Sequence, residues 1–258
     1  MTFIFSIFVF ILGLIIGSFL NCLIWRLYKN ESVGGRSYCP HCHKTIAWYD
    51  NIPVLSFMIL GGRCRYCHEA ISYQYPLVEI ATAILFLLTW QIEVFNPNFT
   101  WLLAHDWLII VTLMIIFVYD LRWQMIPMNV LWPMTALIFI INIFLGYSWF
   151  LLLEFGAIAV IFFLAQYLIT KKRGLGEGDI WLGLFLGIAF PSAAELILIL
   201  LLSYGVGAII GLILMAGHKK EWRSKIALGP FLAFGAIITL IWAGTIINWY
   251  LMNIVKSF

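Results

Sequence analysis

Long apolar runs separated by short polar segments dominate this sequence. A bilayer-spanning helix needs about 20 mostly apolar residues, and eight runs come close to that length. They lie near 3–25, 76–93, 101–120, 128–146, 149–169, 179–190, 193–217 and 227–252. The pattern predicts an all-α polytopic membrane protein with about eight transmembrane helices. The run at 179–190 is short for a bilayer, and a short helix in a locally thinned membrane is the alternative for it.

The composition excludes a water-soluble globule. Apolar residues make up 64% of the 258 residues and charged residues only 10%, whereas a soluble domain is roughly half apolar and about a quarter charged. The net charge of +3 is small and scattered, so it gives no reason to expect nucleic acid as a partner. The expected partner of most of the surface is the lipid bilayer.

The basic residues predict an orientation. With eight spans and the N-terminus outside, fourteen of the fifteen Lys and Arg residues fall in connections on one face, and only Lys256 does not. Positive charge is retained on the cytoplasmic side of membranes, so this face is predicted to be cytoplasmic. The orientation requires the short run at 179–190 to cross, because otherwise the basic segment 218–225 would change sides.

Residues 26–75 are the only predicted connection long enough to form a domain. They are polar and rich in Cys, Gly and Arg. The sequence therefore predicts a first transmembrane helix over 1–25, a cytoplasmic cysteine-bearing loop over 26–75, and a seven-helix membrane domain over 76–258.

Four cysteines in this loop have the spacing of a metal site. Two Cys-x-x-Cys pairs, Cys39 with Cys42 and Cys64 with Cys67, are separated by 21 residues, which is typical of a four-thiolate zinc site. Two disulfides are the alternative, but a cytoplasmic loop is in a reducing compartment. Such a closed site would be structural, and would stabilise a loop that has little core of its own. Neighbouring histidines that could replace one ligand are His41, His43 and His68.

Two aspartates are candidates for catalysis because acids within apolar segments are costly. Asp120 closes the third run, and Asp179 follows a glycine-rich stretch and opens the sixth. Both are predicted at the cytoplasmic end, where two close carboxylates could share one proton and activate water. The alternatives are an ion pair of Asp120 with Arg122 or the 171–173 cluster, and a helix-capping role for Asp179.

Other polar residues in or near the apolar runs receive weaker interpretations. Glu79 lies one turn into the second run, where it could line the same cavity, bind a cofactor or mark the membrane boundary. The adjacent His105 and Asp106 could form a proton relay near the outer face.

Short motifs lie along nearly the whole chain. They are Gly17-Ser18-Phe19-Leu20-Asn21, Arg26, Cys39-Pro-x-Cys42, residues 48–56, Gly62-Arg63-Cys64-Arg65-x-Cys67, Ile71-Ser72, Tyr75-Pro76-Leu77-Val78-Glu79, Asp120, Ile126-Pro127, Asn129, Gly176-Glu177-Gly178-Asp179 and Gly229-Pro230-Phe231-Leu232-Ala233. Taken together, these motifs resemble those of the type IV prepilin peptidases, bifunctional leader peptidases and N-methyltransferases of the GxGD class of intramembrane aspartic proteases.

The resemblance implies an activity. It makes 76–258 the aspartic peptidase domain, with Asp120 and Asp179 as the catalytic pair. It implies prepilin or pseudopilin substrates, cut after a glycine on the cytoplasmic side of the inner membrane. It also implies methylation of the new N-terminus from S-adenosylmethionine, associated with the Cys39, Cys42, Cys64 and Cys67 loop; the residues of the methyl-donor site and the oligomeric state are not predicted.

One position departs from the family pattern. Members usually carry a lysine two residues after the GxGD aspartate, and here that residue is Trp181. Lys171 or Lys172 could take over its role.

Two other functions fit part of the pattern. One is a GxGD protease without methyltransferase activity, but this function would leave the cysteine loop unexplained. A transporter with a zinc-stabilised loop should show acids near mid-membrane and an inverted repeat, and neither is evident.

Overall fold

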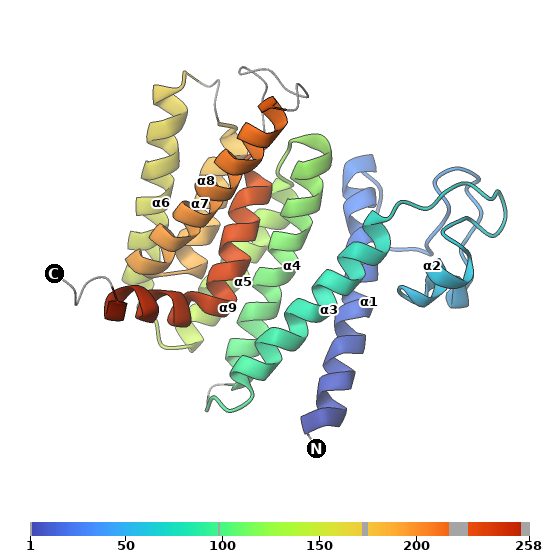
Figure 1. The fold of residues 1–258 in the computed structure, drawn as a ribbon, viewed down its shortest axis with the longest axis horizontal. Helices are drawn as coiled ribbons and strands as arrows, with labels where there is room; N and C mark the ends of the chain where they lie inside the picture. The colour runs from blue at the N-terminus through green and yellow to red at the C-terminus, as the bar shows by residue number, and fades with distance from the viewer. Residues whose placement is uncertain (1, 98, 172–174, 217–226, 254–258) are drawn as a thin grey trace. The chain divides into compact units, whose positions relative to one another are not determined.

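The computed structural model describes residues 2–97, 99–171, 175–216 and 227–253. Over these residues, each of the eight apolar runs corresponds to a helix, and Figure 1 labels these helices. They are α1 (Thr2–Lys29), α3 (Gln74–Glu93), α4 (Phe99–Trp123), α5 (Met128–Phe144), α6 (Trp149–Ile169), α7 (Glu177–Ala189), α8 (Ala193–Ala216) and α9 (Gly229–Asn253). The short helices η1 (Trp48–Asn51) and α2 (Leu55–Ile59) lie between α1 and α3. The predicted all-α polytopic fold is confirmed.

The helices differ in how they meet the membrane. Within the described ranges, six are long and apolar enough to cross a bilayer, and α5 is a shorter apolar helix of 17 residues. Helix α7 has 13 residues, which corresponds to about 20 Å, less than the roughly 30 Å of the hydrocarbon core. Its side chains explain how it can be short, because Leu182, Phe185 and Leu186 are almost fully buried. Helix α7 is thus surrounded largely by protein.

The chain divides into two compact units, residues 1–96 and 97–258. In the first unit α1 packs along α3 (Figure 1). Gly13 and Gly17 of α1 make this possible, because a Cβ at Gly17 would lie 2.7 Å from the Cα of Glu79, and one at Gly13 would lie 2.5 Å from the Cα of Ala83. Small residues four apart allow such close helix contact in membranes.

Arg26 fixes the start of the cysteine loop to α1. Its side chain is buried, with 4% of its surface exposed, and its guanidinium donates hydrogen bonds to four consecutive backbone carbonyls. These belong to residues 33–36, at distances of 2.5 to 3.2 Å. Carbonyl acceptors satisfy the planar fork of donors, so the chain after α1 is held in a defined turn.

The second unit is a helical bundle with an aliphatic core. Helix α4 packs against α5 and α9, α7 packs against α5 and α6, and α8 packs against α9. Glycines again allow one close contact, since Gly183 and Gly187 of α7 leave no room for a Cβ against Phe163 and Phe155 of α6. The core includes Ile109, Leu113, Ile116, Leu131, Ile138, Phe163, Phe185, Leu232 and Ala236. This packing fixes α7 relative to its neighbours.

Several sequence-based expectations stay predictions. One is the predicted division into a helix over 1–25, a loop over 26–75 and a peptidase domain over 76–258. It assigns a function to each segment, and the packing of the helices does not test a function. Most of the basic residues expected after α6 and α8 lie outside the described residues, namely Lys172, Arg173, Lys219, Lys220, Arg223 and Lys225.

Candidate active site and metal centre

Asp120 lies in the last turn of α4. The helix continues to Trp123, so the aspartate sits inside the helix rather than at its end, and only 5% of its surface is exposed. Its carboxylate accepts a hydrogen bond from the backbone N–H of Gly229, the first residue of α9. Among the described residues it forms no ion pair, so neither Arg122 nor Lys171 pairs with it; Lys172 and Arg173, the rest of the cluster considered from the sequence, lie outside the described residues.

Asp179 lies in the first turn of α7 and is also buried, with 8% exposed. Its Oδ2 accepts a hydrogen bond from the backbone N–H of Gly176 at 2.9 Å. This satisfies a donor at the helix start, and the carboxylate also matches the positive end of the helix dipole. The capping role considered from the sequence is therefore real. The other oxygen, Oδ1, is engaged by no described residue and remains available for chemistry.

The ends of α4 and α7 are brought together by the connection after α4. A Cβ at Gly178 would lie 3.0 Å from the Cβ of Ile126, so the start of α7 lies directly against the segment that follows Asp120. The two carboxylates are close enough for the charge of Asp179 to act on Asp120. Two buried acids in this relation repel when both are ionised, which disfavours the state in which both carry a charge.

Gly229 closes the site from the side of α9. A Cβ at this position would lie 2.5 Å from Oδ2 of Asp120 and 3.1 Å from its Cγ, closer than real contacts allow. Any side chain here would push the Asp120 carboxylate away from its present position.

We therefore expect Gly229→Ala to lower, roughly 10- to 100-fold, the rate of the reaction that the Asp120 carboxylate takes part in, because sub-ångström to ångström displacements of reacting groups cost about that much. Gly244→Ala is a matched control in the same helix, since nothing lies within 4 Å of its added Cβ. Rates are compared in membranes at equal protein level. Equal rates for the two variants would show that the contact with Asp120 is not critical.

The four loop cysteines converge on one point. Their sulfur atoms all lie within 4.8 Å of one another, and Cys39 Sγ and Cys67 Sγ are 3.8 Å apart. Four thiolates at about 2.3 Å from a tetrahedral zinc ion are about 3.8 Å apart, whereas a disulfide requires about 2.05 Å. All five cysteines are free thiols. The arrangement fits the predicted zinc site and not the disulfide alternative.

The two cysteine pairs have the same local structure. In each, the N–H of the residue after the second cysteine bonds to the carbonyl of the first, from His43 to Cys39 and from His68 to Cys64, both at 2.9 Å. Both histidines have a positive φ, 54° and 58°, which histidine tolerates better than most residues. His41, His43 and His68 are exposed and lie outside the sulfur cluster, so they are not in place as substitute ligands.

Contacts between segments support the metal centre. Arg65 forms a two-point ion pair with Asp50 of η1, at 2.6 and 2.8 Å. The bond from Arg65 holds the pKa of Asp50 below its ordinary value. Hydrogen bonding from the Cys67 backbone lowers the pKa of the Cys64 thiol to about 7, whereas the pKa of the neighbouring Cys67 thiol is raised to about 12.

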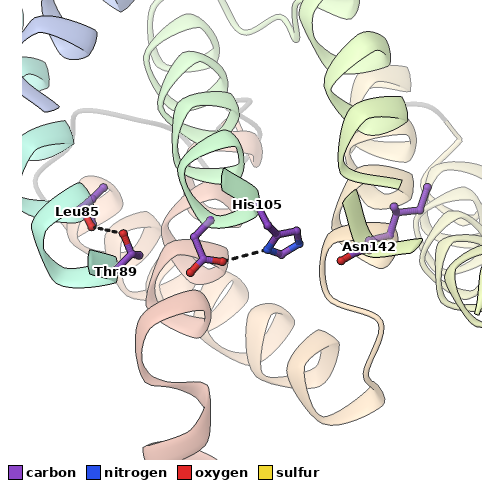
Figure 2. A network of polar contacts seen from close by, with 6 residues as sticks. Leu85, Thr89, His105 and Asn142 are labelled. Atoms are coloured by element: carbon purple, nitrogen blue, oxygen red, sulfur yellow. Dashed lines mark hydrogen bonds and ion pairs between the residues drawn. The ribbon is translucent and has the colours of Figure 1, made fainter. Parts of the chain in front are cut away.

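Two further groups of buried polar side chains lie in α4 and in α3. His105 Nδ1 and Asp106 Oδ1 are 3.0 Å apart in α4 (Figure 2), and His105 Nε2 is buried without a partner among the described residues. Their role as a proton relay stays a prediction. In α3, the hydroxyl of Thr89 bonds to the carbonyl of Leu85 (Figure 2), so its polarity is satisfied inside its own helix.

Comparison with known proteins identifies the family. Two family models match, the bacterial peptidase A24 N-terminal domain over residues 11–92 and the type IV leader peptidase family over residues 107–212. The chain belongs to the type IV leader peptidase family. Relatives named prepilin leader peptidase/N-methyltransferase include those of Pseudomonas aeruginosa, 34% identical over 93% of this chain and 91% of the relative, and Aeromonas hydrophila, 34% identical over 95% and 93%.

A third relative carries a related name. The type 4 prepilin-like proteins leader peptide-processing enzyme of Escherichia coli is 33% identical over 88% of this chain and 90% of the relative. No solved structure is significantly similar. The resemblance read from the sequence motifs is confirmed, and the leader peptidase match contains both Asp120 and Asp179.

The one departure from the family pattern has a structural setting. Trp181 of α7 is 39% exposed, and its ring lies 4.8 Å from that of Trp132 in α5. It therefore packs between helices in a way that a lysine would not. Lys171 is exposed after α6, and Lys172 lies outside the described residues, so compensation by either stays a prediction.

Sequence reasoning missed two contacts near Asp179. The hydroxyl of Tyr167 in α6 donates to Glu177 Oε1 at 2.7 Å, and Glu177 is the first residue of α7. Tyr204 of α8 donates to Gln166 at 2.7 Å. The first pair joins consecutive helices and the second joins α6 to α8, and a tyrosine in an apolar run gives no sign of its partner.

Proposed function

We propose that this protein is an intramembrane aspartic endopeptidase that removes the leader of type IV prepilins or pseudopilins, cutting after a glycine, and then methylates the new N-terminus. The observation that carries the peptidase part is the juxtaposition of two buried aspartates, Asp120 and Asp179, at the facing ends of α4 and α7. The family and the names of its relatives support both activities.

The proposed hydrolysis uses the pair with one shared proton. The ionised carboxylate takes a proton from water, and the resulting hydroxide attacks the carbonyl carbon of the scissile glycine. The protonated carboxyl gives its proton to the carbonyl oxygen. As the tetrahedral intermediate collapses, the C–N bond breaks, the amine leaves with the proton held by the first aspartate, and one hydroxyl of the intermediate returns its proton to the second aspartate. The shared proton is restored for the next cycle.

The surroundings of the pair suit a peptide in extended conformation. Residues 176 and 178 are glycines, and Gly178 already lies against Ile126 without a side chain. Backbone without side chains lets another chain approach closely. We infer that the scissile segment binds along this stretch, next to the free Oδ1 of Asp179.

Zinc has a structural part in the proposal. Cys39, Cys42, Cys64 and Cys67 would hold one Zn²⁺ with four thiolates, which leaves no coordination position for substrate. The ion would join the two cysteine pairs and order the loop. S-adenosylmethionine, when bound, supplies an electrophilic methyl group for the second reaction.

The proposed orientation places the cysteine loop and both aspartates on the cytoplasmic side of the inner membrane. The one-sided distribution of Lys and Arg supports it. Cleavage at this side would leave the apolar part of the substrate in the bilayer.

One incubation tests both activities. Membranes that contain the protein are mixed with a single prepilin and S-adenosylmethionine, and the product is read by mass spectrometry. We expect loss of the leader together with one added methyl group on the new N-terminal residue. Leader loss without the methyl group would support the alternative of a GxGD protease alone, and an unchanged substrate would contradict the proposal.

A further inference from the structure

Glu79 is a buried carboxylate that the proposed peptidase chemistry does not use. It lies in the first turns of α3, a candidate membrane span, and 6% of its surface is exposed. Among the described residues it forms no ion pair. A buried acid in a membrane helix is costly, and such residues usually bind or transfer an ion or proton.

The partners of Glu79 are neutral. Its Oε2 accepts a hydrogen bond from the backbone N–H of Val54 at 2.8 Å, and the carboxylate also accepts from the hydroxyl of Ser18. An ionised carboxylate can accept about four hydrogen bonds, so two remain for a ligand. No cationic side chain of the described residues pairs with this carboxylate, so a cation is the ligand class that would balance its negative charge when it is ionised.

The site is built where the two helices and the loop meet. Gly17 brings the α1 backbone against Glu79. One turn further along α1, Asn21 is 2% exposed, and its amide donates to the carbonyl of Tyr75 at 3.1 Å while its Oδ1 accepts from Gln74 at 3.0 Å. These bonds hold α1 and α3 in register beside the carboxylate, so its position is rigid on the helix side.

The loop side of the site is a strained turn. Val54 has φ 61° and ψ −50°, which is unfavourable for a β-branched residue. Its N–H points at Glu79 in this conformation. The flanking side chains are apolar and exposed, Ile52 at 37% and Leu55 at 51%. A cationic ligand that reaches Glu79 from the loop side would lie next to these apolar side chains. The site therefore favours a cation that has an apolar group beside its charge.

We propose that Glu79 binds the α-ammonium group of the mature pilin N-terminus and accepts its proton before methyl transfer. This inference rests on the proposed methyltransferase function. An N-terminal ammonium attached to an apolar residue has both properties that the site selects, a positive charge and an adjoining apolar side chain.

The proton balance gives the carboxylate a defined role. An ammonium nitrogen has no lone pair and cannot attack. Transfer of one proton to Glu79 leaves a neutral amine, whose nitrogen attacks the methyl carbon of the sulfonium donor. The N–C bond forms as the S–C bond breaks, and a neutral thioether leaves. The methylated product is again an ammonium, and Glu79 later releases its proton to solvent.

The test uses Glu79→Gln in the full-length protein. Glutamine has the same shape, and its amide oxygen can still accept the hydrogen bond from Val54, but it carries no charge and takes up no proton. A synthetic apolar peptide with a free N-terminal Phe serves as the methyl acceptor, so that no leader cleavage is needed. We expect methylation to fall at least about 100-fold, the usual worth of a general base, while leader cleavage of a prepilin changes less than twofold.

A binding measurement without methyl donor gives an independent readout. The unmodified protein should bind the free-amine peptide at least tenfold more tightly than its N-acetylated form, and Glu79→Gln should remove that preference. Methylation and binding by Glu79→Gln equal to those of the unmodified protein would overturn the proposal, and Glu79 would then be an anchor for the loop.

Two controls separate this role from stability. Glu79→Gln should retain about one zinc ion per chain, because loss of the loop structure would release the metal. Loss of zinc in this variant would show that Glu79 stabilises the loop, and would overturn a role limited to binding the ammonium group and accepting its proton. Thr89→Val in the same helix removes a buried polar group bonded within α3, and it should methylate normally. If the unmodified protein methylates no peptide, the proposed function fails, and the binding preference still decides whether Glu79 holds an ammonium group.

Discussion

Replacement of either Asp120 or Asp179 by Asn should abolish leader cleavage, with a loss of about 10⁴-fold or more, because each carboxyl has to exchange a proton in every cycle. Asparagine keeps the size and the hydrogen bonds from Gly229 and Gly176, so the fold should be unaffected. The double variant should be no worse than either single one, since residues that act as a unit are not additive. Cleavage is measured in membranes at equal protein level.

Asp106→Asn is the matched control for this experiment. Asp106 lies in α4, the helix of Asp120, and 8% of its surface is exposed, as for Asp179. It is bonded to His105 and is not part of the proposed pair. Cleavage by this variant should stay within about threefold of the unmodified protein, as for residues outside the reacting centre. Retained cleavage in Asp120→Asn or Asp179→Asn would refute the pair, and a comparable loss in Asp106→Asn would point to the His105–Asp106 relay.

Loss of the metal is the second large effect that we expect. The purified protein should contain about one zinc ion per chain, and Cys39→Ser or Cys67→Ser should lose it, because three thiolates leave the tetrahedral site open. Metal binding supplies much of the folding free energy of small loops of this kind. We expect methylation to fall more than tenfold, since the loop carries Val54, which bonds to Glu79.

Cys22→Ser distinguishes the metal site from general effects of losing a thiol. Cys22 is a half-buried free cysteine of α1 outside the sulfur cluster, so this variant should keep both its zinc and its methylation. Leader cleavage should be less sensitive to zinc than methylation is, because Asp120 and Asp179 lie in a unit with its own aliphatic core. Full activity in metal-free protein would contradict a required zinc site.

The helices could be predicted because the membrane imposes a local rule. Every backbone polar group in hydrocarbon must be satisfied within its own segment, so an apolar run of sufficient length is a helix whatever surrounds it. All eight runs, including the short one at 179–190, correspond to helices. The cysteine cluster was predictable for a related reason, because Cys-x-x-Cys brings two thiols to one point through a local turn.

The neighbours of the candidate residues could not be predicted in this way. Gly229 meets Asp120 across a sequence separation of more than one hundred residues, and Val54 meets Glu79 through an unusual backbone conformation of its own. The sequence marks Glu79 as a costly acid but does not say which groups surround it. Contacts of this kind depend on how helices are placed against one another, which no run of residues encodes locally.

The sequence by itself determined the class of protein, the eight apolar helices, and the four loop cysteines and two aspartates as candidates, because apolar length, ligand spacing and the cost of buried charge are local properties. Only the tertiary structure decided that the ends of α4 and α7 meet, that Gly229 closes on Asp120, and that Glu79 is buried among neutral partners. These are consequences of packing between segments that are distant in sequence. Whether such segments can approach depends on single atoms, such as the Cβ that glycine lacks at position 229.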